Sequence, residues 1–207
     1  MFITIEGIEG VGKTTNLKHI AEYLHHKELP VLITREPGGT PLANDIRSFL
    51  LNEHNEKIHP DTELLLMFAA RSQHVQRIIK PALEAEKWVI CDRFTDASYA
   101  YQGAGRGIDM DRIAALESWV QGQLRPDLTI LLDAPLEIAL QRIKKRGKLD
   151  RFESEEISFF RRVRQCYLDR AQAEPDRFII INTDRDLPEI QKEIDEKLDE
   201  TLLKSAC

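Results

Sequence analysis

Cysteine is scarce in this chain, and its scarcity excludes two classes of protein. Only Cys91, Cys166 and Cys207 occur among 207 residues, and no two of them form a Cys-x-x-Cys pair. A disulfide framework needs more cysteines than this, and a cysteine-ligated zinc site needs them closer together. We therefore expect a protein of a reducing compartment.

Long apolar runs, signal-like segments and an excess of positive charge are also missing. No run approaches the roughly 18 to 20 apolar residues of a membrane-spanning helix, and the opening MFITIEG lacks the basic-then-apolar layout of a secretory signal. Acidic side chains outnumber basic ones by 35 to 29, for a net charge of −6. That balance disfavours a surface that coats nucleic acid. We expect a cytoplasmic protein that binds neither membrane nor nucleic acid.

Short apolar runs alternate with long helical patterns along the chain. Runs rich in β-branched residues predict five strands, at 2–5, 31–34, 88–91, 128–132 and 178–181. Their almost continuous hydrophobicity is typical of a parallel sheet covered on both faces. Helices are expected at 14–26, 41–51, 61–86 with a kink or an end at Pro81, 111–124, 136–146, 155–173 and 187–203. The prediction is one α/β domain over 1–207, a three-layer sandwich without internal repeats or flexible linkers.

A phosphate-binding motif follows the first expected strand directly. Residues 7–14, GIEGVGKT, match G-x-x-x-x-G-K-[ST] in full and lead into a helical pattern. The glycines let successive N–H groups point at phosphate oxygens, and the helix presents its positive end to the same anion. The residues expected to hold ATP are Gly7, Ile8, Glu9, Gly10, Val11, Gly12, Lys13, Thr14 and Thr15. A glycine-rich turn without a ligand is the alternative.

Within this motif, Lys13 is expected to contact the β/γ-phosphates and Thr14 to bind a bridging Mg²⁺ ion. Two expected strands also end in an aspartate, at the edge where open α/β sheets bind ligands. Asp92 is the stronger metal candidate, because its neighbour Arg93 offers a fork of donors to a phosphate. Asp133 precedes Ala-Pro and can instead begin a turn or cap a helix. A structural salt bridge is the alternative for Asp92 and Arg93.

Glu9 and a set of arginines indicate a second, phosphorylated substrate. A carboxylate inside an anion-binding loop is unfavourable unless it faces a hydroxyl or a metal, so we interpret Glu9 as a ligand of a sugar hydroxyl. A solvated side chain without a role is the alternative. The arginines placed to hold a second anion are Arg35, Arg47, Arg71 and Arg93. Each alone is more often a solvated charge, but together they favour an anionic acceptor.

Three segments of the chain resemble bacterial thymidylate kinases. They are IEGIEGVGKTT at 5–15, TREPGGT at 34–40 and DRFTDASYAYQGAGRG at 92–107. The resemblance runs essentially from end to end. It implies a P-loop nucleoside monophosphate kinase fold, transfer of the ATP γ-phosphoryl group to dTMP with Mg²⁺, and a homodimer.

The resemblance assigns roles on the sugar and phosphate side of dTMP. Glu9 resembles the acidic residue near the 3′-hydroxyl, and Arg47 and Arg93 resemble the pair that holds the phosphate. Glu36 would organise metal and water around that phosphate, and the Glu36–Pro37 bond matches a site that is often cis. Tyr101 resembles the aromatic residue that leaves no room for a 2′-hydroxyl, although an ordinary packed tyrosine is the alternative.

On the base side, Arg71 resembles the reader of thymine O4, an acceptor that cytosine replaces with a donor. Ser98 and Gln102 match the polar base contacts of the family. The stacking residue stays open: relatives carry phenylalanine four positions before the arginine, where this chain has Met67. Phe68, three positions before, is our expected stacking residue, with Met67 as the alternative.

The basic run RIKKRGKLDR at 142–151 resembles the lid of this kinase group, at about 142–153. The phosphate-binding loop carries no arginine at its variable positions, so the resemblance implies that the lid supplies the catalytic cation. Arg146 and Arg151 are the expected lid arginines, which join Lys13 and Arg93 in the catalytic set. Arg142 would support them. A solvated basic helix end is the alternative.

Charge neutralisation and alignment would dominate such a reaction, because the acceptor phosphate is already anionic and needs no strong base. Two other functions stay open. One is a kinase of the same fold that acts on a different monophosphate. The other is a nucleotide-dependent switch, which the missing Asn-Lys-x-Asp motif and the acceptor-side arginines count against.

Overall fold

The computed structural model describes residues 1–147 and 150–205, except for the side chains of Arg146, Lys204 and Ser205. Five strands form one parallel sheet in the order β2-β3-β1-β4-β5. The strands are β1 (Phe2–Glu6), β2 (Val31–Arg35), β3 (Trp88–Asp92), β4 (Leu128–Asp133) and β5 (Phe178–Asn182). The predicted five-stranded parallel sheet is confirmed, with β1 at its centre.

Each strand runs one residue past its predicted end. The five additional residues are polar, and they lie together at the carboxyl edge of the sheet: Glu6, Arg35, Asp92, Asp133 and Asn182. An apolar pattern cannot reveal a last residue that is polar although its backbone still pairs. The strand ends therefore already carry the charged groups of the site.

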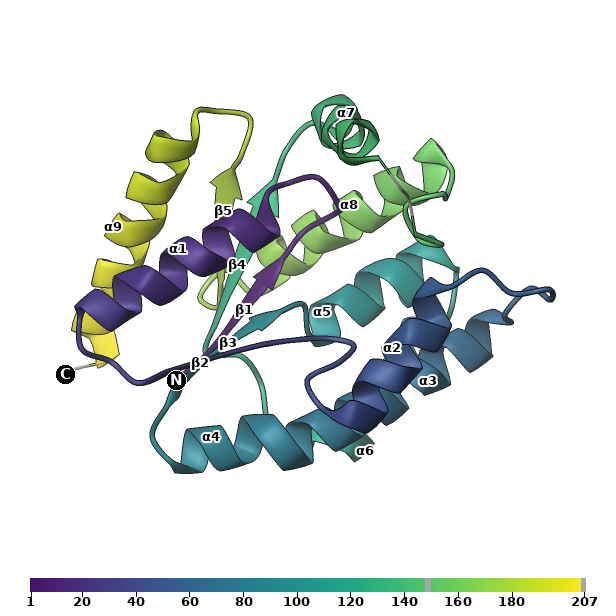
Figure 1. Cartoon of the computed structure of the whole chain (residues 1–207), viewed down its shortest axis with the longest axis horizontal. Coiled ribbons are helices and arrows are strands. Elements are labelled where there is room, and N and C mark those ends of the chain that lie inside the picture. The colour runs from purple at the N-terminus through teal and green to yellow at the C-terminus, as the bar shows by residue number, and fades with distance from the viewer. Residues whose placement is uncertain (148–149, 206–207) are drawn as a thin grey trace.

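Helices cover both faces of the sheet, as Figure 1 shows. α1 (Lys13–His26) and α9 (Leu187–Ser205) pack side by side on one face, and α8 (Ile157–Ala173) lies against β4 and β5 on the other. The remaining α-helices whose positions were predicted are α2 (Pro41–Leu51), α6 (Met110–Gln121) and α7 (Leu136–Arg146). Local signals explain their accuracy: the Thr40 hydroxyl caps α2 and Pro41 opens it.

The long helix expected at 61–86 is instead interrupted. α3 (Pro60–His74) passes into a π-helical segment, η1 (Val75–Ile79), and then into α4 (Lys80–Glu84). Pro81 lies in the first turn of α4, so the predicted disturbance is present but begins before the proline. Pro81 has no N–H and its ring crowds the carbonyl four residues earlier, which the wider π turn accommodates.

A helical segment at 95–105 escaped prediction. It comprises α5 (Thr95–Ser98) and a second π-helical segment, η2 (Tyr99–Gly105). Its sequence, TDASYAYQGAG, combines aromatic residues and glycines with low helix propensity. Tertiary packing stabilises it instead, because the buried Tyr101 ring contacts those of Phe152, Phe159 and Tyr167 edge-on.

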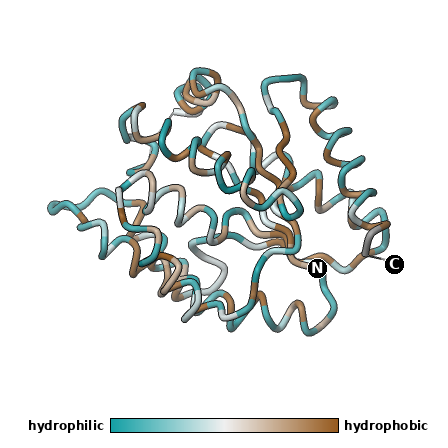
Figure 2. The backbone as a smooth tube through the Cα atoms, turned by 180° about the vertical axis from the view of Figure 1, so that it is seen from behind, coloured by the Kyte–Doolittle hydropathy of each residue, from teal (hydrophilic) through white to brown (hydrophobic). Residues whose placement is uncertain are grey.

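Hydrophobic residues concentrate in the strands at the centre of the molecule, as Figure 2 shows. Ile3 and Ile5 of β1 are fully buried. Across the part of the chain that is described, the helices are too short or too polar to cross a bilayer.

A buried ion cluster connects α5, α8 and the segment that precedes β5. Asp96 of α5 accepts from Arg170 of α8 at 2.5 Å and from Arg177, before β5, at 2.8 Å. Asp96 is 2% exposed, and these guanidinium groups hold the pKa of its carboxyl below the ordinary value despite burial. The cluster fixes α5, and with it the segment that carries Ser98 and Tyr101.

We expect Asp96→Asn to lower the free energy of unfolding by about 3 kcal/mol, because two partly buried guanidinium groups lose their buried counter-charge. Urea denaturation measures this change. Glu174→Gln is the matched control, since Glu174 is an exposed partner of the same arginines and should cost less than about 1 kcal/mol. Equal effects of the two substitutions would contradict the assigned importance of the buried cluster.

Candidate active site

The phosphate-binding loop joins β1 to α1, and its lysine folds back over it. The Lys13 ammonium donates to the carbonyls of Gly7 and Ile8 at 2.9 and 2.8 Å. Burial lowers the pKa of Lys13 to about 8, with the positive charge of Arg93 acting in the same direction. The side chains of Ile8 and Val11 are buried, so these residues offer only backbone groups to a ligand. Thr14 and Thr15 lie exposed at the start of α1.

Arg93 connects this loop to a neighbouring cavity. Its Nη1 donates to the Gly7 carbonyl at 2.9 Å and to Tyr167, and its Nη2 donates to Glu9 at 2.8 Å and to Tyr101 at 3.0 Å. The residue has a φ of 69°, a conformation that costs energy outside glycine and that is typical of functional sites. Attraction from its polar neighbours outweighs burial and raises the pKa of Arg93 well above its ordinary value. Arg93 is therefore a permanent cation between two sites.

Glu9 of the phosphate-binding loop binds two side chains of the cavity wall. Its two carboxylate oxygens accept from Arg93 and from the Tyr101 hydroxyl, the latter at 2.6 Å. These cationic and hydroxyl partners, together with Lys13, lower the pKa of Glu9 although burial opposes the shift. The carboxylate is thus ionised and placed at the border of the cavity.

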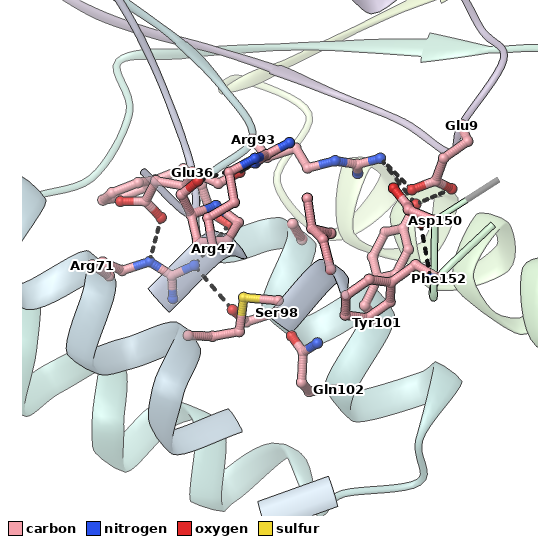
Figure 3. Close-up of a pocket in the computed structure, with 15 residues that line it drawn as sticks. Glu9, Glu36, Arg47, Arg71, Arg93, Ser98, Tyr101, Gln102, Asp150 and Phe152 are labelled. Carbon is pink, nitrogen blue, oxygen red and sulfur yellow. Dashed lines mark hydrogen bonds and ion pairs between the residues drawn. The ribbon is translucent and has the colours of Figure 1, made fainter. Parts of the chain in front are cut away.

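A cavity beside Arg93 is lined by both charged and apolar side chains, as sites for small organic ligands are. Figure 3 shows its wall, on which the loop after β2, helices α2 and α3 and the 95–105 segment converge with the phosphate-binding loop. Eight side chains named by sequence reasoning line it: Glu9, Glu36, Arg47, Arg71, Arg93, Ser98, Tyr101 and Gln102. Residues more than 90 positions apart are thereby brought together.

Arg71 is held rigidly at the inner end of the cavity. Its Nε donates to Glu36 at 2.7 Å, and its Nη2 donates to the Phe94 carbonyl and to the Ser98 hydroxyl at 3.1 and 3.0 Å. Nη1 is buried and has no partner among the described residues. A ligand that presents a carbonyl oxygen here would satisfy this donor.

Arg47 and Gln102 occupy two other parts of the wall. The Arg47 Nη1 donates to the Pro37 carbonyl at 3.0 Å, and the peptide bond between Glu36 and Pro37 is cis, as predicted. Burial and the nearby cation Arg35 lower the pKa of Arg47, which an incoming anion would counteract. The Gln102 amide donates to Glu63 at 2.9 Å, which leaves its carbonyl oxygen for other contacts.

The expected position of Phe68 requires correction. Its ring is 2% exposed and lies beneath the Arg71 guanidinium at 4.5 Å, and it does not line the cavity. Met67 lines the cavity instead. The two are successive helical residues, so only the rotation of α3 decides which faces the ligand, and sequence spacing could not fix that rotation.

Glu36 is engaged by two protein side chains. Its oxygens bind Arg71 at 2.7 Å and His74 at 2.9 Å, and its side chain is 4% exposed. Glu36 therefore orients Arg71, and its expected role around a metal and a phosphate stays a prediction.

Of the two predicted lid arginines, Arg146 and Arg151, the structure describes the side chain of Arg151 alone. The side chain of Arg146 lies outside the described residues. Arg151 points away from the phosphate-binding loop, because its Nε donates to the Leu50 carbonyl at 2.8 Å and its Nη2 to Glu63 at 2.7 Å. Its expected position at the phosphates is thus not adopted here, since a fully buried carboxylate holds it elsewhere. Phe152 and Asp150, which sequence reasoning missed, bring the same segment to the cavity wall.

The proposed metal ligands lie on the other side of Arg93. Thr14 and Asp92 line one common depression beside the start of α1, and the Asp92 Oδ1 is buried without a hydrogen-bond partner in the described part of the chain. These oxygens suit Mg²⁺, which prefers few protein ligands and keeps its water. Asp133, the weaker metal candidate, forms a bidentate ion pair with Arg164. No group of three or more His, Cys, Asp or Glu side chains suited to a metal occurs among the described residues.

Glu6 is a buried carboxyl that sequence reasoning missed because it lies in an apolar run. It accepts from the Tyr167 hydroxyl and the Phe94 N–H at 2.7 and 2.6 Å, and Tyr167 in turn accepts from Arg93. Burial and the negative charge of Asp96 raise the pKa of Glu6 to about 7, although Arg93 opposes them. Through Tyr167, Glu6 therefore helps to hold the Arg93 side chain in place.

Comparisons with known proteins agree with this geometry. A family model described as thymidylate kinase matches residues 5–194. The chain is 54% identical over 202 residues to the thymidylate kinase of Pseudomonas syringae pv. tomato, covering 98% of this chain and 96% of that protein. It is 52% identical over 207 residues to that of Ectopseudomonas mendocina, covering 100% and 98%. The solved thymidylate kinase from Ehrlichia chaffeensis superposes with a TM-score of 0.78 at 37% identity, covering 96% and 98%.

Glu6 generates a prediction about stability and pH. Because its pKa rises from an ordinary 4.5 to about 7 on folding, the folded chain keeps a proton that the unfolded chain releases between these values. Stability contributed by this group is therefore lost as the pH rises through that window, by at most about 3 kcal/mol. Urea denaturation of wild type and Glu6→Gln at pH 5 and pH 8 should show a steeper loss for the wild type. The exposed Glu22→Gln controls for net charge, and parallel profiles for wild type and Glu6→Gln would refute the assignment.

Proposed function

The chain belongs to the thymidylate kinase family, and on that premise we propose that it transfers the γ-phosphoryl group of ATP to dTMP, giving dTDP and ADP. The observation that carries the proposal is the shared Arg93, whose guanidinium binds the Gly7 carbonyl of the donor loop and the Glu9 carboxylate of the acceptor cavity. A protein that only hydrolysed ATP would have no need of a second cationic cavity at this junction. We take 1–207 as one kinase domain with its lid at about 142–153.

ATP would bind along residues 7–15, with its phosphates on the backbone N–H groups and on Lys13. The Lys13 ammonium, now on two loop carbonyls, is close enough to turn to a phosphate. Negative phosphate oxygens would favour its charged form against the effect of burial. Thr14 and Asp92 would hold Mg²⁺, directly or through water. When bound, the ion neutralises charge on the phosphate oxygens.

dTMP would fill the acceptor cavity with its phosphate toward the donor. The free Nη1 of Arg71 supports a place for thymine O4 at the inner end, with Ser98 and Gln102 nearby and Met67 against the ring. Glu9 and Tyr101 would border the sugar, and Arg47 and Arg93 the phosphate. Cytosine would place an amino group against the Arg71 donor, so it would bind poorly.

The reaction would depend on alignment rather than on proton transfer. Arg47 and Arg93 offset the repulsion between two anionic nucleotides, and Lys13 stabilises charge that develops on the moving group. A lid arginine, Arg146 or Arg151, would complete this set once the lid closes. For Arg151, closure must exchange the Glu63 and Leu50 contacts for a phosphate. A closed lid would also exclude water and prevent hydrolysis of ATP.

We also propose that the protein is a cytoplasmic homodimer. Large apolar side chains stand exposed on α3 and on the two helices that pack against it: Leu65 on α3, Leu42 and Phe49 on α2, and Trp119 on α6. Trp119 is 83% exposed, and such a group of apolar side chains favours a protein interface.

A panel of monophosphates tests the function directly. With ATP and Mg²⁺, a coupled assay of ADP release should show turnover with dTMP well above that with dCMP, dAMP or dGMP, and chelation of Mg²⁺ should abolish it. Lys13→Ala should reduce kcat by a factor of 100 or more, on the order expected when a phosphate-binding cation is removed. Preference for another monophosphate would indicate a different acceptor. ADP release that is independent of every monophosphate would indicate a switch protein.

The selection of deoxyribose can be tested at Tyr101, whose ring and hydroxyl have separable contacts. Tyr101→Ala removes the ring and should raise the relative kcat/KM for ribo-TMP by about tenfold or more. Tyr101→Phe keeps the ring but loses the contacts with Glu9 and Arg93, so it should lower activity without admitting the ribonucleotide. Equal discrimination by both variants would reject the ring as a steric gate.

A further inference from the structure

One nitrogen of Arg71 is free because every other part of the side chain is fixed. Glu36, the Phe94 carbonyl and Ser98 hold Nε and Nη2 in the plane of the guanidinium. The rings of Phe68 and Phe94 lie at 4.5 and 5.3 Å from its central carbon. The orientation of the buried Nη1 therefore depends on the group that holds Nε.

That group, the Glu36 carboxylate, is itself held by a second residue. Its Oε2 accepts from Arg71, while its Oε1 lies 2.9 Å from Nδ1 of His74. Arg71 and His74 are three positions apart on α3, so they project from the same face of the helix. One carboxylate thus bridges two side chains of one helix to the loop that follows β2.

The His74 ring has no contact with solvent and a defined partner on each nitrogen. Its Nε2 lies 2.6 Å from the Thr34 hydroxyl on β2, and the ring is 0% exposed. Because a carboxylate oxygen only accepts, Nδ1 carries a proton and donates to Glu36. The Thr34 hydroxyl can then donate to Nε2 in the neutral ring. Both nitrogens are satisfied, which fixes the ring in one orientation.

Gly39 leaves the space in which this ring lies. A Cβ atom on Gly39 would come within 2.4 Å of His74 Cδ2 and 2.9 Å of the Thr34 Oγ1, and its φ is +87°. The glycine of the loop after β2 is therefore required for the close approach of α3. The contact chain runs from Thr34 through His74 and Glu36 to Arg71.

From this chain of contacts we propose that His74 is a positioning residue for base recognition, which fixes Glu36 so that Arg71 presents Nη1 to a pyrimidine with a carbonyl at position 4. The proposal rests on the proposed function and deepens it. Without the His74 bond, the Glu36 carboxylate is free to rotate and to turn the guanidinium with it. Nη1 then loses its fixed direction, while the phosphate-binding loop, Arg93 and Lys13 are untouched.

Two ligands that differ on the base edge alone separate this role from general stability. 5-Methyl-dCMP has the methyl group, sugar and phosphate of dTMP but carries an amino group at position 4 and no proton on N3. The ratio of kcat/KM for dTMP to that for 5-methyl-dCMP therefore reports the reading of this edge. The KM for ATP reports the donor site in the same experiment.

His74→Asn and His74→Gln form the decisive pair. The asparagine amide nitrogen falls near Nδ1 and can still donate to Glu36, whereas the glutamine amide nitrogen falls near Nε2 and reaches Thr34 instead. We expect His74→Asn to keep the ratio within about threefold of wild type, and His74→Gln and His74→Leu to lower it about tenfold, as for loss of a charge-assisted hydrogen bond. In His74→Gln and His74→Leu the KM for dTMP should rise, whereas kcat and the KM for ATP should stay within about twofold of the wild-type values.

Gln76→Leu is the control, because it places a leucine on an exposed position of the same helical stretch and should change none of these values. Thermal unfolding of every variant establishes which ones are folded, and the Asn–Gln pair decides the question should His74→Leu fail to fold. Equal ratios for wild type, His74→Asn and His74→Gln would overturn the proposal. Failure of the wild type to prefer dTMP would instead overturn the proposed function.

Discussion

The position of the Arg93 guanidinium is the constraint on which the rest of the site depends. This one cation contacts the phosphate-binding loop at Gly7 and the cavity at Glu9, so under the proposed function it would set the distance between the two nucleotide sites. Its left-handed backbone conformation is strained, and the surrounding contacts maintain it. Tyr167 accepts a hydrogen bond from Arg93 and donates one to Glu6, so these two residues help to hold the guanidinium in place. Alignment of two anions follows from this one placement.

Buried carboxylates organise the cationic site throughout. Glu36 orients Arg71, Glu9 pairs with Arg93, and Glu63 holds Arg151 away from the phosphates. A chain with a net charge of −6 can thus place Arg71 and Arg93 in one cavity, because each is paired with a carboxylate that fixes its direction. In Arg71 this leaves Nη1 without a partner among the described residues. Binding then adds a partner to a prearranged donor at little cost in reorganisation.

In the lid segment, too, a buried carboxylate fixes the direction of an arginine, but here it holds the arginine away from the phosphate-binding loop. Arg151 is tied to Glu63 and to the Leu50 carbonyl, so its predicted contact with a phosphate requires these bonds to exchange. Glu63 is also bonded to Gln102 of the cavity wall. Under the proposed mechanism, occupation of the cavity and release of Arg151 would therefore involve the same buried carboxylate.

The sequence by itself determined the parallel sheet, the phosphate-binding loop and the type of residue at nearly every position of the cavity, because these depend on local patterns of apolar residues, glycines and charges. It did not determine the direction of each side chain. Phe68 was expected in the cavity, but the rotation of α3 placed Met67 there, and the helix at 95–105 forms only because tertiary packing outweighs its weak propensity. The roles of His74 and Glu6 depend on hydrogen bonds between strands and helices that are far apart in the chain. Such bonds produce no periodic pattern in the sequence, so only the tertiary structure reveals these roles.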